Sequence, residues 1–350
     1  MSRPIHVATL GASGYGAAEL LRLCTQHPAV EVVSVTSTSQ SGQRLDHLYP
    51  HLRGFYDLAV SESIDIERLL AGEHAVVFSA LPHGVSAATL DELLSHAPAE
   101  RIRAIDLSGD LRLQDMELHA RYYPKSPALP QRRKEFVYGL PELFRERVRG
   151  AQYVANPGCL ASAAILAVAP LTGPEFAGVV ALDAKTGSSG SGRQLKETTH
   201  HPTRHGNFRA YKPLAHQHEP EVLQILGDPH GTRIQTSFVA QSLDTVRGIF
   251  VTAHLSLPEP TDVGTLRQRY ADFYADSPFV RVVDDSPELQ NVVGSNFCEL
   301  SVACRGRQVV AMAALDNLIK GMAGVAIQNM NLMCGLPETT GLWTPALRLV

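Results

Sequence analysis

Cys159 is the side chain whose position most strongly indicates reactivity. It follows the turn-forming residues Asn156, Pro157 and Gly158, and the apolar run LASAAILAVAPL comes directly after it. That run predicts a helix with Cys159 at its N-terminal end. Because the start of a helix carries partial positive charge, it stabilises a thiolate. We therefore expect Cys159 to act as a nucleophile near neutral pH, with Asn156 as a candidate substrate ligand.

Two histidines, His216 and His218, lie in the segment AYKPLAHQHEPEV. A histidine titrates near pH 7, so one placed beside a thiolate can pair with it and pass a proton to a developing alkoxide. A histidine that only forms structural hydrogen bonds is the alternative, and the chain holds 15 histidines. Two basic residues just before the pair, Arg209 and Lys212, are further candidate substrate ligands.

A zinc hydrolase is the competing enzyme class, because imidazole is a common zinc ligand and histidines crowd one stretch of the chain. These histidines are His200, His201, His205, His216 and His218. None of them forms a helical H-x-x-x-H face with a glutamate base, and the intervening prolines and glycine indicate loop. We therefore expect no metal site.

A glycine-rich turn lies near the start of the chain, between an expected strand and an expected helix. Residues 11–17 fit the pattern G-x-x-G-x-x-A. Small residues there let backbone N–H groups and the helix N-terminus approach a pyrophosphate. A tight connection without a ligand is the alternative. The candidate cofactor ligands in this turn are Gly11, Ser13, Gly14, Tyr15 and Gly16.

The residues after the second expected strand bear on the choice of cofactor. An acidic residue there binds the ribose of NAD, whereas polar and basic groups accommodate the 2′-phosphate of NADP. The chain has Ser37, Thr38 and Ser39 at this place, with Arg44 nearby and no carboxylate. This favours NADP, with solvated turn hydroxyls as the alternative.

Two further polar segments are candidate binding sites. Residues 187–193 follow an expected strand, and Ser189 and Gly190 could hold an anion or the nicotinamide end of a cofactor, unless the segment is a plain mobile loop. Residues 106–112 end a strand at the edge where open α/β sheets collect ligands. Arg112 is therefore a candidate phosphate contact, with a surface salt bridge as the alternative.

Alternating strands and helices in the first part of the chain must position these groups. Buried-strand patterns are IHVATL from Ile5, VEVVSVTS at 30–37, AVVFSALP at 75–82 and RAIDLSG at 103–109. Strands that alternate with helices imply right-handed crossovers and a parallel sheet. We expect an α/β domain here.

The pattern changes after about residue 157 to longer β-rich runs, namely GVVALDAKTG, TRIQTSFVAQ, GIFVTAHLSL and RQVVAMAAL. Their spacing predicts a mixed or antiparallel sheet in a second, α+β domain. The final stretch NLIKGMAGVAIQNMNLMCGL predicts a long buried helix that packs back on the first domain. We therefore divide the chain into 1–157 plus 319–350, and 158–318.

Composition is that of a globular protein, with 44% hydrophobic and 19% charged residues, and 350 residues suit two domains. The formal charge of −4 is spread without a basic block, which argues against nucleic acid as a partner. Five cysteines at irregular spacing fit no disulfide framework. With no signal-like segment and no apolar stretch long enough for a bilayer, we expect no membrane association and a cytoplasmic location.

Motifs in the same order along nearly the whole chain resemble the N-acetyl-gamma-glutamyl-phosphate reductase family of arginine biosynthesis. They are GASGYGAAELLRL, LPHG, DLSGDLRL, ANPGCLASAAILAVAPL, SGSGR, AYKPLAHQHEPEV, RGIFVTA, GSNFCEL and ALDNLIKGMAGVAIQNMNLMCGLPETTGL. The resemblance implies a Rossmann domain completed by the C-terminal helix, and a mixed-sheet catalytic domain, as in aspartate-semialdehyde and glyceraldehyde-phosphate dehydrogenases. It also implies NADP(H) as cofactor, a small acyl phosphate as substrate, and a homodimer or homotetramer.

The resemblance further implies a reaction, in which Cys159 attacks the acyl phosphate, phosphate leaves, and NADPH reduces the resulting thioester to the semialdehyde. Either His216 or His218 is then the acid/base. His216 is favoured, because Arg209 precedes it at a spacing that resembles the substrate-binding arginine and catalytic histidine of the semialdehyde dehydrogenases. The residues that resemble the family's cofactor contacts are 13–16, 37–39 and Asn317.

Two features differ from the family pattern. Gly16 stands where the family turn usually has a threonine, which is expected to loosen one phosphate contact. The stretch HHPTRHGNFRAYKP resembles the related reductases of lysine biosynthesis, which act on an aminoadipyl phosphate, sometimes attached to an acidic carrier protein. GSNFCEL and QNMNLMCGLPETTGL favour the arginine pathway, and the aminoadipyl reaction is kept as the alternative. A redox sensor that binds NADPH without turnover is a further alternative.

Overall fold

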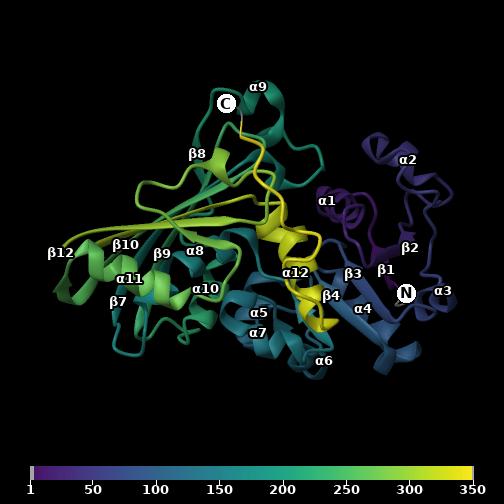
Figure 1. The fold of residues 1–350 in the computed structure, drawn as a ribbon, viewed down its shortest axis with the longest axis horizontal. Helices are drawn as coiled ribbons and strands as arrows, with labels where there is room; N and C mark the ends of the chain where they lie inside the picture. The colour runs from purple at the N-terminus through teal and green to yellow at the C-terminus, as the bar shows by residue number, and fades with distance from the viewer. Residues whose placement is uncertain (1–3, 349–350) are drawn as a thin grey trace. The chain divides into compact units, whose positions relative to one another are not determined.

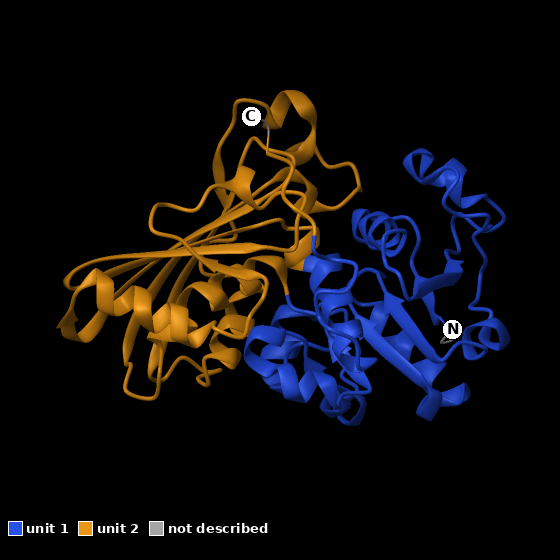
Figure 2. Ribbon diagram, viewed as in Figure 1, with its two compact units in different colours: residues 1–157, 322–343 blue, residues 158–321, 344–350 orange. Residues whose placement is uncertain are grey.

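The computed structural model describes residues 4–348, which form two compact units (Figure 2). Of these residues, unit 1 takes those in 1–157 and 322–343, and unit 2 takes those in 158–321 and 344–350.

The C-terminal tail contacts residues of unit 2. Residues 344–348 group with unit 2. There the Leu347 N–H donates to the Val293 carbonyl at 2.9 Å, and Arg348 forms an ion pair with Glu288 at 3.4 Å. Both contacts join the tail to other residues of unit 2, which explains why the tail groups with that unit.

Unit 1 is built on a six-stranded sheet in which all strands pair in parallel, in the order β2-β1-β3-β4-β6-β5 (Figure 1). The strands are β1 (Ile5–Leu10), β2 (Val30–Thr36), β3 (His74–Ser79), β4 (Ile102–Asp106), β5 (Phe136–Tyr138) and β6 (Tyr153–Ala155). All six residues of β1 are buried, as expected of a strand covered on both faces. The predicted parallel α/β sheet is confirmed.

Helices connect these strands. They are α1 (Tyr15–Cys24), α2 (Leu45–Leu48), α3 (Ile66–Leu70), α4 (Ser86–His96), α5 (Met116–Tyr122), α6 (Pro130–Glu135) and α7 (Pro141–Arg149), with 3₁₀ turns η1 (Pro50–Leu52) and η2 (Ala99–Arg101). A core cluster that includes Val77, Leu90 and Ile102 fills the space between α4 and the sheet. Packing of this kind positions the loops at the carboxyl ends of the strands.

The C-terminal helix α12 (Gly324–Met333) belongs to unit 1, as predicted. All of its residues are buried, including three with amide side chains. Asn329 donates to the Gly139 carbonyl at 2.9 Å, and Asn331 accepts a hydrogen bond of 2.8 Å from the His27 ring. Buried polar groups are stable only when bonded in this way, so these amides fix α12 in place.

Unit 2 contains a second six-stranded sheet, in the order β11-β12-β10-β7-β9-β8. Its strands are β7 (Gly178–Thr186), β8 (Arg209–Tyr211), β9 (Ile234–Ser242), β10 (Ile249–Thr261), β11 (Val280–Val282) and β12 (Cys298–Leu315). The pairs β7–β9 and β11–β12 are parallel and the other three are antiparallel. The predicted mixed sheet is confirmed.

Four helices accompany this sheet. They are α8 (Cys159–Val168), α9 (His201–Arg204), α10 (Glu219–Ile225) and α11 (Val263–Phe273), with 3₁₀ turns η3 (Ala169–Leu171), η4 (Ser188–Ser191), η5 (Glu197–Thr199) and η6 (Leu289–Asn291). Helix α8 contacts β10 and β12, and after Cys159 all of its residues are buried. A helix that is apolar all round belongs in a core.

The predicted long helix near the C-terminus is interrupted. Residues Ile319–Ala323 form a π-helical segment, η7, and α12 begins only at Gly324. Before η7, the Asp316 carboxylate accepts hydrogen bonds from the N–H groups of Leu318 (2.8 Å) and Ile319 (3.1 Å), as a capping side chain does. No helix in the described part of the chain is long and apolar enough to cross a membrane.

Candidate active site

Cys159 is the first residue of α8, so the predicted helix start is confirmed. Gly158 is the N-cap in an extended conformation (φ −71°, ψ 140°), and its carbonyl accepts the Ser162 N–H at 2.8 Å. The Cys159 side chain is half-buried. The cysteine therefore lies where the partial positive charge of the helix stabilises a thiolate.

The His218 ring lies against the backbone next to Cys159. A Cβ atom built on Gly158 would come within 2.5 Å of His218 Nε2, so only glycine leaves room for the ring. The fully buried Glu221 carboxylate accepts the Gly158 N–H at 2.9 Å through Oε2, and its Oε1 is 3.9 Å from His218 Nε2. One carboxylate thus contacts both the start of α8 and the histidine.

His216 contacts both the backbone and the ring of His218. Its Nδ1 accepts the His218 backbone N–H at 3.2 Å, its ring meets the His218 ring edge-on at 4.7 Å, and it stacks on Phe238 at 5.4 Å. Burial, with a smaller effect of the charges on His218 and Lys212, lowers the pKa of His216 to about 2. His216 is therefore neutral, and because Nδ1 accepts a hydrogen bond, its proton is on Nε2.

The segment before the histidines carries the two predicted substrate cations. Arg209 lies in β8 and is exposed, and the Lys212 ammonium donates to Gln217 Oε1 at 2.9 Å. Lys212 and Leu214 have positive φ (46° and 56°), a conformation that costs a non-glycine residue about 1–3 kcal/mol and is concentrated at functional sites. Burial, with a smaller effect of the Cys159 charge, raises the pKa of Tyr211, whose ring meets the His216 ring edge-on at 5.6 Å.

The glycine turn of unit 1 has the geometry of a phosphate cradle. Gly11 has φ +88°, and a Cβ on it would lie 3.0 Å from the Ala80 carbonyl group. The N–H groups of Gly11 and Ala12 donate to the Thr36 carbonyl at 3.0 and 2.8 Å, which fixes the turn to the end of β2. Gly14 is the N-cap of α1, and a Cβ on it would meet nothing within 4 Å. Open space above a helix N-terminus fits the pyrophosphate of a dinucleotide.

Tyr49 supports this turn, although no sequence motif indicated it. The Tyr49 hydroxyl, which is buried, contacts the Ala12 carbonyl and lies 3.0 Å from the Gly14 carbonyl. Tyr49 is distant from the turn in the chain, so a local motif search does not connect the two.

The side chain of Met322 explains why position 16 is a glycine. A Cβ on Gly16 would come within 2.5 Å of Met322 Sδ, so the methionine occupies the space that a side chain on residue 16 would need. Of the other turn candidates, Ser13 and Tyr15 are exposed. Their predicted contacts with the cofactor stay predictions.

The loop after β2 presents hydroxyls. Thr38 and Ser39 are exposed and Ser37 is half-buried, with the Ser37 and Ser39 hydroxyls 3.3 Å apart. Arg44 already forms ion pairs with Asp46 (3.1 Å) and Asp57 (3.0 Å). Arg44 is exposed as well, so the hydroxyls and the guanidinium all stay candidates for contact with a 2′-phosphate.

Arg112 is buried in unit 1 and is no surface salt bridge. Its Nε donates to the Asn156 carbonyl at 2.7 Å and its Nη2 to the Leu107 carbonyl at 3.0 Å. The Asn156 amide donates to the Met322 carbonyl at 3.0 Å. These bonds hold Arg112 and Asn156 together, and their predicted contact with substrate stays a prediction.

The LPHG and DLSGDLRL motifs pack on each other. The Gly84 N–H donates to Asp110 Oδ1 at 2.9 Å, and the Gly109 N–H donates to His83 Nδ1 at 2.7 Å. Asp106 is fully buried, and burial raises the pKa of its carboxyl group. These motifs shape the loops at the ends of β3 and β4.

The remaining predicted cofactor residues lie in unit 2. The Asn317 amide donates to Ser189 Oγ at 2.9 Å, and its oxygen accepts the Gly248 N–H at 2.8 Å. The Ser189 hydroxyl donates to the Val246 carbonyl at 2.7 Å. Gly190 is exposed in η4. Both buried side chains thus hold loops together, and the predicted cofactor contacts of all three residues stay predictions.

The histidine-rich stretch forms no metal cluster. His201 and His205 stack at 5.2 Å, and His205 is 3.3 Å from Asp244. Among residues 4–348, no group of three or more His, Cys, Asp or Glu side chains has a geometry that could hold a metal ion.

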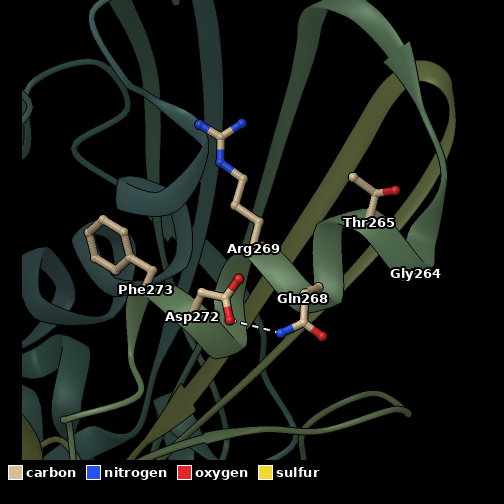
Figure 3. Close-up of a pocket in the computed structure, with 6 residues that line it drawn as sticks. All are labelled: Gly264, Thr265, Gln268, Arg269, Asp272 and Phe273. Atoms are coloured by element: carbon tan, nitrogen blue, oxygen red, sulfur yellow. Dashed lines mark hydrogen bonds between the residues drawn. The ribbon is translucent and has the colours of Figure 1, made fainter.

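A hollow on the outer surface of α11 is not the active site. Figure 3 shows Gln268 donating to Asp272 at 2.8 Å in its wall. Its lining residues are Gly264, Thr265, Gln268, Arg269, Asp272 and Phe273. None of the residues predicted to bind or react is among them.

Two protein-family models match the chain. Residues 6–151 match the model described as Semialdehyde dehydrogenase, NAD binding domain, and residues 159–317 match Semialdehyde dehydrogenase, dimerisation domain. The fold agrees with this class. The aspartate-semialdehyde dehydrogenase from Candida albicans, solved with NADP, matches with a TM-score of 0.70 at 15% identity, over 94% of this chain and 98% of its own.

Curated relatives are more specific. An N-acetyl-gamma-glutamyl-phosphate reductase of Symbiobacterium thermophilum is 43% identical over 97% of this chain and 97% of its own. The chain belongs to the N-acetyl-gamma-glutamyl-phosphate reductase family. A putative phosphate reductase for LysW-linked L-2-aminoadipate and L-glutamate, from Aeropyrum pernix, is 39% identical over 99% of this chain and 100% of its own.

Proposed function

We propose that this protein uses NADPH to reduce N-acetyl-gamma-glutamyl phosphate to N-acetyl-glutamate 5-semialdehyde and phosphate. One observation carries the proposal. Cys159 begins α8, and the residue before it touches the His218 ring and donates to the buried Glu221 carboxylate. The choice of substrate is supported by the relative of that name at 43% identity.

Cys159 is the nucleophile in this proposal. Its thiolate attacks the acyl carbon, a C–S bond forms, the C–O bond to phosphate breaks, and phosphate leaves with the electron pair. NADP(H), when bound at the glycine turn, supplies the hydride that reduces the thioester. The positive end of α8 stabilises the thiolate both before the attack and when it leaves at the end.

We assign the acid/base role to His218, although the spacing from Arg209 favours His216. Protonated His218 gives its proton to the alkoxide formed from the thioester and takes it back as the carbonyl reforms and the C–S bond breaks. Glu221 supports the charged ring at 3.9 Å. His216, whose pKa is lowered to about 2 by burial, is a poor proton donor and holds the His218 backbone instead.

The binding residues complete the proposal. We assign the cofactor to the turn around Gly11 and Gly14, with the hydroxyls of 37–39 favouring NADP over NAD because no carboxylate follows β2. Candidate substrate ligands are Arg112, Asn156, Arg209 and Lys212. We further propose a cytoplasmic homodimer or homotetramer, in line with five free cysteines and the dimerisation-domain match.

The second candidate is the homologous aminoadipyl-phosphate reduction of lysine biosynthesis, on a substrate attached to an acidic carrier. One observation favours it. Residues 193–212 hold five Lys or Arg and a single Glu, and four of the five cations are exposed: Arg193, Lys196, Arg209 and Lys212. Such a basic segment would attract an acidic protein. The Aeropyrum pernix relative has a name of this kind.

Steady-state oxidation of three aldehydes with NADP and phosphate tests the choice. The substrates are N-acetylglutamate semialdehyde, its aminoadipate homologue and aspartate semialdehyde. We expect kcat/KM to be at least about 10-fold higher for the first, since one methylene is worth about 1–3 kcal/mol. A preference for the homologue would support the second candidate. Full turnover by Cys159→Ser would exclude the covalent mechanism, and no turnover of any of the three by the unmodified protein would exclude the first candidate.

A further inference from the structure

Gly321 packs directly on the nucleophile. A Cβ atom on Gly321 would lie 2.7 Å from Cys159 Cβ and 3.3 Å from Cys159 Cα. Carbon atoms in contact are about 3.5–4.0 Å apart, so the site has no room for a side chain here. Gly321 is not among the residues of positive φ, so its backbone conformation alone does not demand glycine. The requirement comes from Cys159.

The backbone of Gly321 is fixed by Asp316. The Gly321 N–H donates to the Asp316 carbonyl at 2.8 Å, and a Cβ on Gly321 would lie 3.3 Å from the same oxygen. The Asp316 side chain accepts the N–H groups of Leu318 (2.8 Å) and Ile319 (3.1 Å) through Oδ1. Asp316 therefore bonds to three later residues of the segment that brings Gly321 to Cys159.

Asp316 is itself anchored to two other loops. It is fully buried, and its Oδ2 accepts the Gly294 N–H at 2.9 Å and pairs with Arg247 at 3.4 Å. A buried carboxylate with this many partners is rigid, because moving it would leave a charge unpaired. The segment 316–321 is thus held at a defined distance from the start of α8.

We infer that Gly321 is a positioning residue that sets the orientation of the Cys159 side chain, and that the Asp316 carboxylate holds Gly321 in place for this purpose. The inference rests on the proposed nucleophilic role of Cys159. Covalent catalysis needs the attacking atom within about 3–3.5 Å of its target, and an error of about 1 Å costs roughly 100-fold in rate. Because Gly321 packs against the Cβ of Cys159, it limits such displacements of the sulfur atom.

The first test is Gly321→Ala, with Gly150→Ala as its control. Gly150 has φ −86°, and a Cβ on it would make ordinary contact with Glu146 O at 3.6 Å. For Gly321→Ala we expect kcat to fall about 100-fold with KM for the semialdehyde within about 3-fold of normal. We also expect slower alkylation of Cys159 by iodoacetamide. Gly150→Ala should change none of these.

Alkylation separates this inference from the proposed function, because it requires no substrate. Altered alkylation in Gly321→Ala would support positioning even if no tested semialdehyde were turned over. Values of kcat and alkylation rate within about 2-fold of the unmodified protein would overturn it.

A double variant covers the case in which Gly321→Ala does not fold. Cys159→Gly removes the atom that the new methyl group would strike, so Cys159→Gly/Gly321→Ala should unfold at a higher temperature than Gly321→Ala alone. Such coupling is a direct sign of contact between the two positions. If the double variant unfolds at no higher a temperature than Gly321→Ala alone, the two positions are not coupled and the inference is contradicted.

Asp316→Asn tests the anchor. Its amide would direct N–H groups at the Gly294 N–H or at Arg247, both of which are donors. We expect the same fall in kcat and in alkylation rate as for Gly321→Ala, in a protein that still binds NADPH. Alkylation at the normal rate would remove Asp316 from the inference.

Discussion

The Glu221 carboxylate accepts a hydrogen bond of 2.9 Å from the backbone N–H of Gly158, the residue before Cys159. This N–H belongs to the start of α8, where backbone donors lack partners within the helix. The second carboxylate oxygen lies 3.9 Å from His218 Nε2. A single buried carboxylate therefore contacts both the start of α8, where Cys159 lies, and the histidine beside it.

Glu221→Gln keeps an acceptor for Gly158 but removes the negative charge near His218. We expect kcat to fall about 10- to 100-fold, and the limb of the pH–rate profile that reports the histidine to move to lower pH, because an anion favours the protonated ring. Glu219→Gln is the matched control on the same turn of α10, since Glu219 accepts a hydrogen bond from Thr236 instead (2.7 Å). An unchanged pH profile in Glu221→Gln would argue against the link to His218.

His216 should make the folded protein sensitive to acid. Burial lowers its pKa from 6.5 to about 2, so below pH 6.5 the unfolded chain binds a proton that the folded protein does not. The free energy of unfolding therefore falls as pH drops from about 6.5 towards 2, by at most about 1.4 kcal/mol per pH unit for this group. Urea unfolding between pH 7 and 5 should show a weaker pH dependence in His216→Gln. An identical slope would contradict the burial of a neutral ring.

The two histidines should also differ in catalysis. If His218 is the acid/base, His218→Asn should lower kcat about 100- to 10,000-fold, whereas His216→Gln should lower it less and mainly reduce stability. Steady-state kinetics of both variants at pH 7 and 8 decide between them. A larger loss of kcat in His216→Gln would reverse the assignment.

Gly16→Thr should weaken NADPH binding unless Met322 is shortened. The new Cβ would lie 2.5 Å from Met322 Sδ, so the start of α1 or the methionine must shift. In Gly16→Thr/Met322→Ala the space is free, and affinity for NADPH, measured by fluorescence titration, should recover. If Gly16→Thr bound NADPH as tightly as the unmodified protein, the Met322 side chain would be able to move aside without weakening cofactor binding.

Thr38→Asp should shift the cofactor preference from NADPH towards NADH. A carboxylate after β2 would repel the 2′-phosphate and bind the ribose hydroxyls. We expect the ratio of kcat/KM for NADPH over NADH to fall at least about 10-fold, the effect of a like-charge contact of about 1–2 kcal/mol. Ala88→Asp, at an exposed position of α4, is the control for an added charge. A ratio unchanged in Thr38→Asp would place the 2′-phosphate elsewhere.

Local sequence was sufficient for the features that depend on neighbours in the chain. The strand patterns, the glycine turn and the helix that starts at Cys159 were predicted, because periodic burial and the start of a helix are set by a few consecutive residues. The interruption at Ile319–Ala323 was missed, since the small apolar residues there are compatible with a regular helix. The Asp316 cap that precedes it depends on contacts with distant loops.

What the sequence alone determined is the list of reactive groups and the elements on which they lie. The tertiary structure decided which of them meet. Glu221 reaches Gly158, Tyr49 reaches Gly14, and Gly321 reaches Cys159 across long stretches of chain. Such contacts follow from how buried side chains pack and satisfy their hydrogen bonds, and no local pattern encodes that packing.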